Sequence, residues 1–228
     1  MSDAHSSRRL GKDDVYIVTT LDGSATLFSR AYQSTYHSIT GAVSESRHVF
    51  VQNGLYLLRH LPLVSILEMG FGTGLNAFLA YLFGHKNHLT VNYTGIEAFP
   101  IETKLALQLE YPGYLVADQL SDIYLRMHQE ERFTAGNFNF QKFLQLESVD
   151  ANQKFDCIFF DAFSPAVHGE LWEQNIFNQI SEMTSTGGLL VTYCAQGEVR
   201  RKMERAGYEV NRIPGAPGKR QMIQAFKR

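Results

Sequence analysis

Short apolar runs alternate with longer stretches of helical periodicity from about residue 63 to the end of the chain. Apolar residues fill the runs at 63–69, 90–98, 155–161 and 188–194, as is typical of strands that are buried on both faces. Between these runs the apolar residues recur at helical spacing. Such alternation is typical of a parallel sheet covered by helices, so the sequence predicts an α/β fold.

The remaining elements of this predicted fold lie between and after the four strong strands. Helices are predicted at residues 73–83, 100–111, 118–131 and 196–206, a weaker strand at 132–138, and two final strands at 208–214 and 219–227. The last two strands are expected to form a hairpin through "PGAPG". A strand–helix alternation that ends in a hairpin is typical of the methyltransferase variant of the Rossmann fold. We therefore expect a mostly parallel sheet of seven strands.

The first 60 residues follow a different pattern. "VYIVTTLDGSATLFS" (15–29) predicts two strands around Asp22-Gly23, a strong hairpin signal. The residues that follow lead into a predicted helix. Because this segment is too short for a core of its own, residues 1–60 are expected to be an extension that packs on the main domain, residues 61–228.

The composition is that of an ordinary globular protein, with 44% apolar and 19% charged residues. Arg59 and His60 interrupt one long apolar stretch, and none approaches the length of a membrane span. The first residues, "MSDAHSSRRLGKDD", lack the apolar centre of a secretory signal. We therefore expect a cytoplasmic protein that makes no contact with a membrane.

The two cysteines and the charge distribution limit the kinds of partner. Cys157 and Cys194 lie in apolar runs without a second thiol at metal-ligand spacing, so we expect buried, reduced thiols and no metal site. The net charge is −2, but residues 200–228 have a charge of +7 and residues 1–199 a charge of −9. This asymmetry is compatible with a patch that faces a polyanion, and equally with a solvated helix and tail.

"EMGFGTGLN" (68–76) follows the first buried strand and opens the first helix. Gly70, Gly72 and Gly74 allow a tight turn and a close approach to a ligand, and the helix start offers free N–H groups. The spacing G-x-G-x-G differs from the dinucleotide fingerprint G-x-G-x-x-G. With Glu68 two residues ahead, the loop favours a ligand that has both a carboxylate and an ammonium group.

Two further polar residues are predicted to complete a nucleoside site. Glu97 ends the second strand and is placed to accept both hydroxyls of a ribose, although an acid there also suits the start of a helix. Asn137 follows the weaker strand and is expected to bond to an adenine edge, unless it is only a turn residue in "AGNFN". Together these features indicate S-adenosylmethionine as the cofactor.

"FFDAFSPAVHGELW" (159–172) contains the candidate catalytic residue. Asp161 ends the fourth strand, at the sheet edge where ligands of α/β proteins bind. A carboxylate there can hold an amine acceptor and receive its proton. Phe163 and Trp172 are expected to form apolar walls for a flat base, with ordinary core packing as the alternative.

The sequence resembles the methyltransferase domain of the bacterial wobble-uridine tRNA-modifying enzymes, the MnmC/MnmD group. The resemblance rests on "GFGTGLN", "EAFP", "DAFSPAVHGELWEQNIF", "GGLLVTYCAQGEVRRKMERAGYEV" and "PGKRQMI", and at the N-terminal end on "DDVYIV", "LFSRAYQSTYHS" and "ESRHVF". It covers nearly the whole chain from about residue 13. Many relatives have a second, flavin-dependent oxidoreductase domain. This chain ends at Arg228, so it resembles the stand-alone form and no flavin is expected.

This resemblance implies methylation of the primary amine of 5-aminomethyl-(2-thio)uridine at the wobble position (34) of tRNA, giving 5-methylaminomethyl-(2-thio)uridine. The implied partners are the tRNA anticodon loop and, functionally, the enzymes that install the aminomethyl group. The catalytic residue is predicted as Asp161. Relatives tend to have an aspartate where this chain has Asn137, which would weaken donor binding without abolishing it.

The resemblance also extends the predicted binding residues. The donor is expected to contact Glu68, Gly70, Phe71, Gly72, Thr73, Gly74, Asn76, Glu97, Ala98 and Asn137. The acceptor is expected to contact Phe163, Ser164, Pro165, Trp172, Tyr36 and Glu45, with Arg200, Arg201, Lys219 and Arg220 facing the tRNA backbone.

Other functions also fit parts of the sequence. An aminopropyltransferase also combines a glycine loop, a ribose acid and an aspartate after the fourth strand, but residues 161–173 lack the string of acids that would grip a polycation. A small-molecule amine N-methyltransferase is a further alternative. A non-catalytic RNA-binding module is disfavoured by Glu68, Glu97 and Asp161, and the glycine spacing disfavours an NAD-dependent oxidoreductase.

Overall fold

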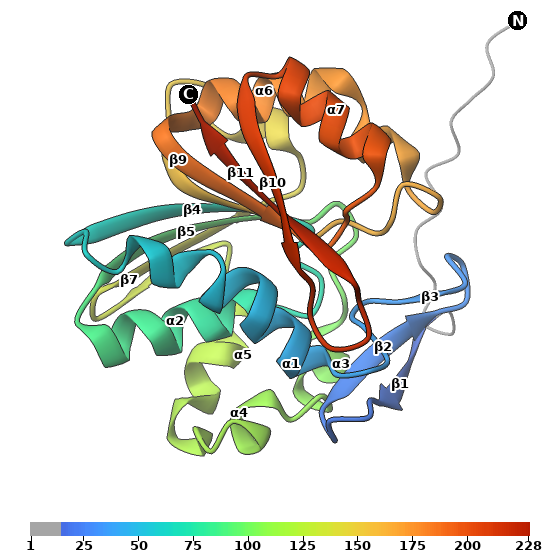
Figure 1. Ribbon diagram of the computed structural model, residues 1–228. Coiled ribbons are helices and arrows are strands. Elements are labelled where there is room, and N and C mark those ends of the chain that lie inside the picture. The colour runs from blue at the N-terminus through green and yellow to red at the C-terminus, as the bar shows by residue number, and fades with distance from the viewer. Residues whose placement is uncertain (1–14) are drawn as a thin grey trace, which may run out of the picture.

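The computed structural model describes residues 15–228, which form two β-sheets and the helices around them (Figure 1). The large sheet has eight strands in the order β10-β11-β9-β8-β4-β5-β7-β6. Its strands are β4 (Leu63–Met69), β5 (Thr90–Ile96), β6 (Arg132–Ala135), β7 (Phe138–Phe143), β8 (Phe155–Phe160), β9 (Thr184–Thr192), β10 (Tyr208–Pro214) and β11 (Gln221–Lys227).

The centre of this sheet is parallel and its two ends are antiparallel. Strands β7, β5, β4, β8 and β9 pair in parallel, whereas β11 pairs antiparallel with β9 and β10 pairs antiparallel with β11. This confirms the predicted α/β fold with a mostly parallel sheet and a C-terminal hairpin. The prediction omitted one strand, β7, which pairs in parallel with β5 and antiparallel with the edge strand β6.

Helices cover both faces of the large sheet (Figure 1). One face packs against α2 (Leu75–Asn87) and α5 (Ser121–Gln129), and the other against α6 (Gln174–Met183) and α7 (Gly197–Arg205). Because side chains alternate along a strand, neighbouring residues of β4 serve different cores. Ile66 belongs to the apolar cluster on the α2 side, and Leu67 to the one on the α6 and α7 side.

Residues 15–60 pack on the α2 side of the main sheet. They contain β1 (Val15–Thr19), β2 (Ala25–Ser29), β3 (Ser34–Thr35), α1 (Ala42–Ser46), the π-helix η1 (Arg47–Gln52) and the 3₁₀-helix η2 (Leu55–Leu58). The predicted hairpin is present, and the Asp22 carboxylate in its turn accepts hydrogen bonds from the backbone N–H groups of Ser24 (3.0 Å) and Ser44 (2.9 Å). Leu27 and Phe50 share one core with α2. The predicted extension began at residue 1, and residues 1–14 lie outside the described residues.

The predicted helix at 100–111 is instead two short helices. They are α3 (Thr103–Leu107) and α4 (Tyr111–Tyr114). Glu110 has a positive φ of 51°, a conformation that a continuous right-handed helix cannot contain, and Pro112 then suits the first turn of α4. Three further 3₁₀-helices lie in connections: η3 (Asp118–Leu120), η4 (Leu146–Ser148) and η5 (Gly169–Trp172).

The weak strand predicted at 132–138 is confirmed over residues 132–135 but ends earlier than predicted, which affects the site. These residues form β6 and the turn into β7, with Ala135 opposite Phe138 and Gly136-Asn137 as the two-residue loop. Gly136 has a positive φ of 59°, as such tight hairpins require. The parallel strand of this region is therefore β7, and it ends at Phe143 rather than near Asn137.

Candidate active site

A pocket lies at the carboxyl ends of the parallel strands and is walled by the N-terminal extension. Its lining comes from the segments after β4 (69–73), β5 (96–99), β7 (144–147) and β8 (161–163 and His168). Tyr32, Tyr36 and His37 of the extension complete the wall, with Leu171 and Ile176. This is the sheet edge at which α/β proteins bind their ligands.

The glycine loop after β4 lies directly against the end of β8. Gly70 has φ of 90°, and a Cβ at this position would lie 2.7 Å from the backbone oxygen of Asp161. A side chain there would force the two strand ends apart. Gly74 has φ of 73° and starts α2 in a left-handed conformation, which glycine adopts without strain.

Glu97 is fixed at the end of β5 by the same loop. Its Oε2 accepts a hydrogen bond from the Gly72 N–H (2.7 Å), and its Oε1 accepts one from the Phe99 N–H (2.9 Å). Burial raises the pKa of this carboxyl group, while the two backbone hydrogen bonds and Lys142 oppose the rise. Each oxygen has further acceptor capacity, so the group can still accept hydroxyl hydrogens in the pocket.

Asp161 lines the pocket beside the glycine loop. Its Oδ2 accepts a hydrogen bond from the Asn76 amide (2.8 Å), and the same amide nitrogen donates to Oε1 of Glu68 (2.9 Å). Burial raises the pKa of Asp161 well above its usual range, and Glu45 adds to the rise. The Asn76 hydrogen bond and the charge of Lys219 act in the opposite direction.

Aromatic rings from two distant segments meet over the pocket. The Phe163 ring lies 4.8 Å from that of Tyr32 and 5.0 Å from that of Tyr36, measured between centroids. The Tyr32 ring also lies 5.3 Å from His168. The extension and the loop after β8 thus close one side of the pocket together, through contacts between aromatic edges and faces.

Comparison with known proteins supports a methyl-transfer site. A family model described as S-adenosyl-L-methionine-dependent methyltransferase matches residues 119–228. The tRNA 5-methylaminomethyl-2-thiouridine biosynthesis bifunctional protein MnmC of Azoarcus sp. is 31% identical over 215 aligned positions, which are 87% of this chain and 34% of that protein. MnmC of Ectopseudomonas mendocina is 28% identical over 242 positions, 98% of this chain and 35% of that protein.

Solved structures agree with this likeness. The crystal structure of MnmC2 from Aquifex aeolicus superposes with a TM-score of 0.75 at 26% identity, and the match covers 92% of this chain and 70% of that one. The chain is an S-adenosylmethionine-dependent methyltransferase related to MnmC. It spans about a third of the length of the MnmC relatives that it matches. Spermidine synthase from Thermotoga maritima, with a TM-score of 0.58 at 15% identity over 96% of this chain and 72% of that one, shares the fold alone.

S-adenosylmethionine, the cofactor of this methyltransferase, suits the residues that line its pocket. Gly70 has no side chain, so it borders the pocket with backbone atoms alone. The acceptor atoms of Glu97 suit the two ribose hydroxyls. Leu144, Leu146 and Ile96 offer an apolar surface for the adenine ring.

The structure brings several predicted donor residues to the pocket of this methyltransferase. Those that line it are Gly70, Phe71, Gly72, Thr73, Glu97 and Ala98. Thr73 is nearly inaccessible, and its backbone oxygen accepts hydrogen bonds from the Tyr124 hydroxyl (2.8 Å) and holds the His128 ring at 3.1 Å.

Glu68 does not line the pocket. Its side chain is 0% exposed and lies beneath Asn76, on the α2 side of β4. Burial raises the pKa of Glu68 well above its usual range, so a direct ion pair with an ammonium group in the pocket does not fit this position. The sequence correctly placed an acid at the end of β4. The sequence pattern does not indicate on which side of the loop the carboxyl group lies.

Asn137 is not at the pocket either, which corrects the prediction that it binds adenine. The start of β7 lies beside the start of β5, at the opposite edge of the sheet. There the Asn137 amide donates hydrogen bonds to the backbone oxygens of Gly84 (3.1 Å) and Leu89. The residues after β7 take the expected place, and Gln145 is the amide side chain among them. The alternation in "FNFQKF" was the signal that could have found this strand end.

Trp172 is 1% exposed, so the prediction that it contacts the acceptor is corrected in favour of core packing. Its ring packs on Phe160 and Phe177, and its Nε1–H donates a hydrogen bond to the backbone oxygen of Phe163 (2.7 Å). It thereby holds Phe163, which does line the pocket. Ser164 and Pro165 lie in the turn beside it and are not among the lining residues.

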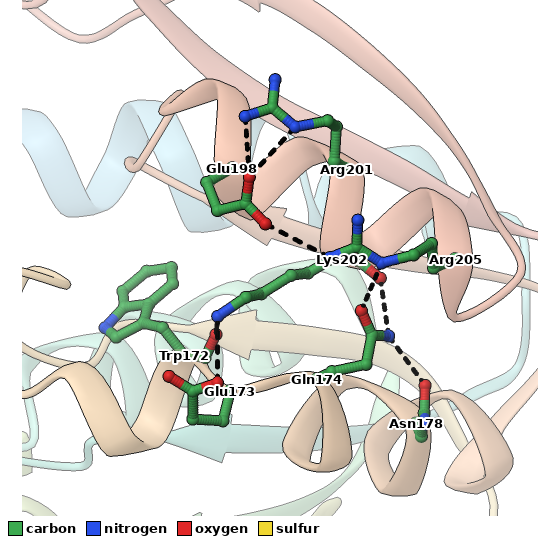
Figure 2. A network of polar contacts seen from close by, with 8 residues as sticks. All are labelled: Trp172, Glu173, Gln174, Asn178, Glu198, Arg201, Lys202 and Arg205. Atoms are coloured by element: carbon green, nitrogen blue, oxygen red, sulfur yellow. Dashed lines mark hydrogen bonds and ion pairs between the residues drawn. The ribbon is translucent and has the colours of Figure 1, made fainter.

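Most of the predicted tRNA-facing cations have acidic partners. Arg200 pairs with Glu204 (2.8 Å) and Arg201 with Glu198 (2.7 Å). The second pair belongs to a polar network that joins α7 to the start of α6 (Figure 2). Arg220 is exposed.

Lys219, predicted to face the tRNA backbone, lies away from α7, and its side chain is 32% exposed. Its Nζ forms an ion pair with Glu45 of α1 and lies 4.0 Å from the centre of the Tyr193 ring. Glu45 is buried, and its Oε2 accepts a hydrogen bond from the Ser38 N–H (2.7 Å). Tyr36, the other predicted contact from the extension, lines the pocket.

Between residues 15 and 228, no helix has the length and apolar character needed to cross a bilayer. Over the same residues, no three His, Cys, Asp or Glu side chains gather closely enough to hold a metal ion.

Proposed function

We propose that this methyltransferase acts on cytoplasmic tRNA and methylates the primary amine of 5-aminomethyl-(2-thio)uridine at the wobble position. The product is 5-methylaminomethyl-(2-thio)uridine. The observation that carries the proposal is the position of Asp161: a carboxyl group with a raised pKa, beside the donor loop, in a pocket that an extension of the chain helps to close.

The position of Asp161 suits an amine acceptor better than a hydroxyl or a carbon acceptor. A primary alkyl amine arrives largely as an ammonium ion and must lose a proton before its nitrogen can attack. A carboxylate whose pKa lies above its usual range is a stronger base, so it can both attract the ammonium and accept its proton. Bound S-adenosylmethionine supplies an electrophilic methyl group. The nitrogen bonds to this carbon as the carbon–sulfur bond breaks, and the electron pair of that bond stays on sulfur.

The choice of a wobble uridine rests on the relatives. MnmC of Azoarcus sp. is named for 5-methylaminomethyl-2-thiouridine biosynthesis in tRNA, and this chain matches a third of its length. Within this chain, the exposed cations at the start of α7 support an RNA partner. A Cβ at Gly197 would lie 3.4 Å from the Arg201 guanidinium and 3.7 Å from that of Arg212, so these two arginines lie together.

The direct test is methyl transfer to tRNA that has the aminomethyl group but lacks the methyl group. The purified protein is incubated with this tRNA and a methyl-deuterated donor, and the wobble nucleosides are analysed by mass spectrometry. We expect a labelled 5-methylaminomethyl nucleoside. Label in another nucleoside, or only in a small amine added as competitor, would contradict the proposal.

Asp161→Ala is the variant that tests the role of Asp161. We expect transfer to fall by about a hundredfold or more, the usual contribution of a general base, while binding of the donor, measured by calorimetry, persists. Asp156→Asn is the matched control, because Asp156 lies on the same strand but bonds to the Ser65 N–H (2.9 Å) away from the pocket. Equal turnover by Asp161→Ala and this control would exclude Asp161 from the reaction.

A further inference from the structure

A single buried amide joins two carboxyl groups beneath the glycine loop. The Asn76 side chain is 2% exposed, and its nitrogen donates one hydrogen bond to Glu68 (2.9 Å) and one to Asp161 (2.8 Å). An amide NH₂ group has only two hydrogens to donate. Both are therefore used, and the orientation of the amide is determined by the two carboxyl groups together.

Glu68 faces two polar side chains, the Asn76 amide and the Tyr93 hydroxyl group. Its side chain is 0% exposed. The groups that bear on its ionisation are Tyr93 of β5, Glu97 after β5, Asn76 of α2 and Asp161 after β8, and none of the four is a cation. A charged carboxylate is strongly disfavoured in such surroundings.

We propose that Glu68 is a positioning residue, which fixes the Asn76 amide so that this amide holds the Asp161 carboxylate toward the acceptor amine. The identification of the acceptor as an amine rests on the proposed function. The contacts from Glu68 to Asn76 to Asp161 are independent of that function.

The physical basis is that a hydrogen-bonded chain orients each member through the next. Without Glu68, the Asn76 amide can rotate about its last side-chain bond, and Asp161 then loses a partner that stabilises its charged form. The hydrogen bond from Asn76 lowers the pKa of Asp161. Loss of Glu68 or of Asn76 should therefore weaken the reaction and also make Asp161 harder to ionise.

Glu68→Gln and Glu68→Ala separate this role from a direct contact with the donor. Glutamine keeps the shape and an oxygen acceptor for Asn76, so we expect it to retain kcat and the Kd of the donor. Alanine should lower kcat about tenfold, which corresponds to roughly 1.4 kcal/mol, with the donor Kd unchanged. If Glu68→Gln instead loses donor affinity to the same extent as Glu68→Ala, Glu68 is a charged ligand of the donor and the proposal is wrong.

Two further readouts test the coupling. Asn76→Ala should shift the acidic limb of the kcat profile to higher pH, because Asp161 loses the hydrogen bond that favours its charged form; an unshifted limb would contradict the proposal. In the double variant Glu68→Ala/Asn76→Ala, kcat should fall no further than in Asn76→Ala alone, because Glu68 acts through Asn76. Effects that simply add would mean that the two residues act separately.

Stability measurements keep the test independent of the substrate. A carboxyl group whose pKa is raised by folding keeps its proton in the native state at a pH where the unfolded chain has lost it. The stability that it contributes is then lost as the pH rises from its usual pKa through its folded pKa. Urea unfolding should show wild type losing stability relative to Glu68→Gln over this window. If wild type fails to methylate tRNA but Glu68 and Asn76 are coupled in a stability cycle, only the proposed function fails. If the two residues show no coupling in that cycle, the positioning role itself is wrong.

Discussion

Two polar clusters bind basic side chains of the C-terminal segment, and they differ in burial and in what they connect. In the Lys219 cluster (Lys219, Glu45 and Tyr193), the side chains of Lys219 and Glu45 are 32% and 7% exposed. In the α7 network (Glu198, Arg201 and Arg205), every side chain is more than half exposed.

The connections made by the two clusters differ as well. The Lys219 cluster joins the loop between β10 and β11 to α1 of the extension, and the Tyr193 hydroxyl donates a hydrogen bond to the backbone oxygen of Ala162, next to Asp161. The α7 network pairs exposed side chains of one helix, and Arg205 connects it through Gln174 to the start of α6 (Figure 2). The basic residues of the C-terminal segment thus differ in role: Lys219 contacts residues that support the active site, whereas Arg201 and Arg205 lie largely in solvent.

Lys219→Met should have the largest effect of the changes that test this contrast. It leaves the buried Glu45 carboxylate without its partner, and breaking a buried pair in this way costs about 3–5 kcal/mol; we expect the lower end, because Lys219 is partly exposed. The free energy of unfolding in urea is the measurement. Arg220→Met, one residue along the same loop, is the control, and an equal loss of stability in both variants would remove the distinction.

Lys202→Met should have an intermediate effect. Lys202 is 16% exposed, and its Nζ donates a hydrogen bond to the backbone oxygen of Trp172 (2.9 Å) at the end of the loop that contains Asp161. Loss of a hydrogen bond from a charged donor should destabilise the protein by about 1.5 kcal/mol, measured again by urea unfolding. If Lys202→Met lowers the free energy of unfolding as much as Lys219→Met does, burial of the partner carboxylate does not explain the difference between Lys219 and Lys202.

Glu198→Gln should have the smallest effect on folding. The exposed pairs of Glu198 with Arg201 and Arg205 are screened by salt, so the unfolding midpoint should not change measurably. The change frees both arginines, and tRNA binding should then depend more steeply on salt, because more phosphate contacts become available. An unchanged salt dependence would show that this part of α7 is a solvated face and not an RNA contact.

The sequence predicted the residues whose positions depend on strand ends. Glu97 and Asp161 both follow buried apolar runs, and parallel strands bring their carboxyl ends to one edge, so the pattern alone predicted that the two side chains lie near one pocket. The prediction for Asn137 also depended on a strand end, and it was wrong. The two-residue hairpin at Gly136-Asn137 reverses the chain, and one wrongly placed strand end moved the residue to the opposite edge of the sheet.

The sequence pattern could not predict which groups the buried polar side chains contact. Lys219 and Glu45 are far apart along the chain, and nothing in the local pattern of either residue indicates the other. Glu68 was predicted correctly as a strand-end acid, but its function depends on whether Asn76 lies above it. Such contacts are set by how the extension, the helices and the hairpin pack together, which periodicity does not encode.

The shared packing of residues 15–60 also has a consequence for how this polypeptide can be divided. Leu27, Val49 and Phe50 are inaccessible to solvent and belong to the same apolar cluster as Phe78 of α2, and the ring of Tyr36 would meet a Cβ at Gly72 at 3.1 Å. A protein begun at residue 61 would expose an apolar face and open the donor pocket on one side. The natural unit for transplanting this activity into another protein therefore begins ahead of β1 (Val15–Thr19), well before the first strand of the large sheet.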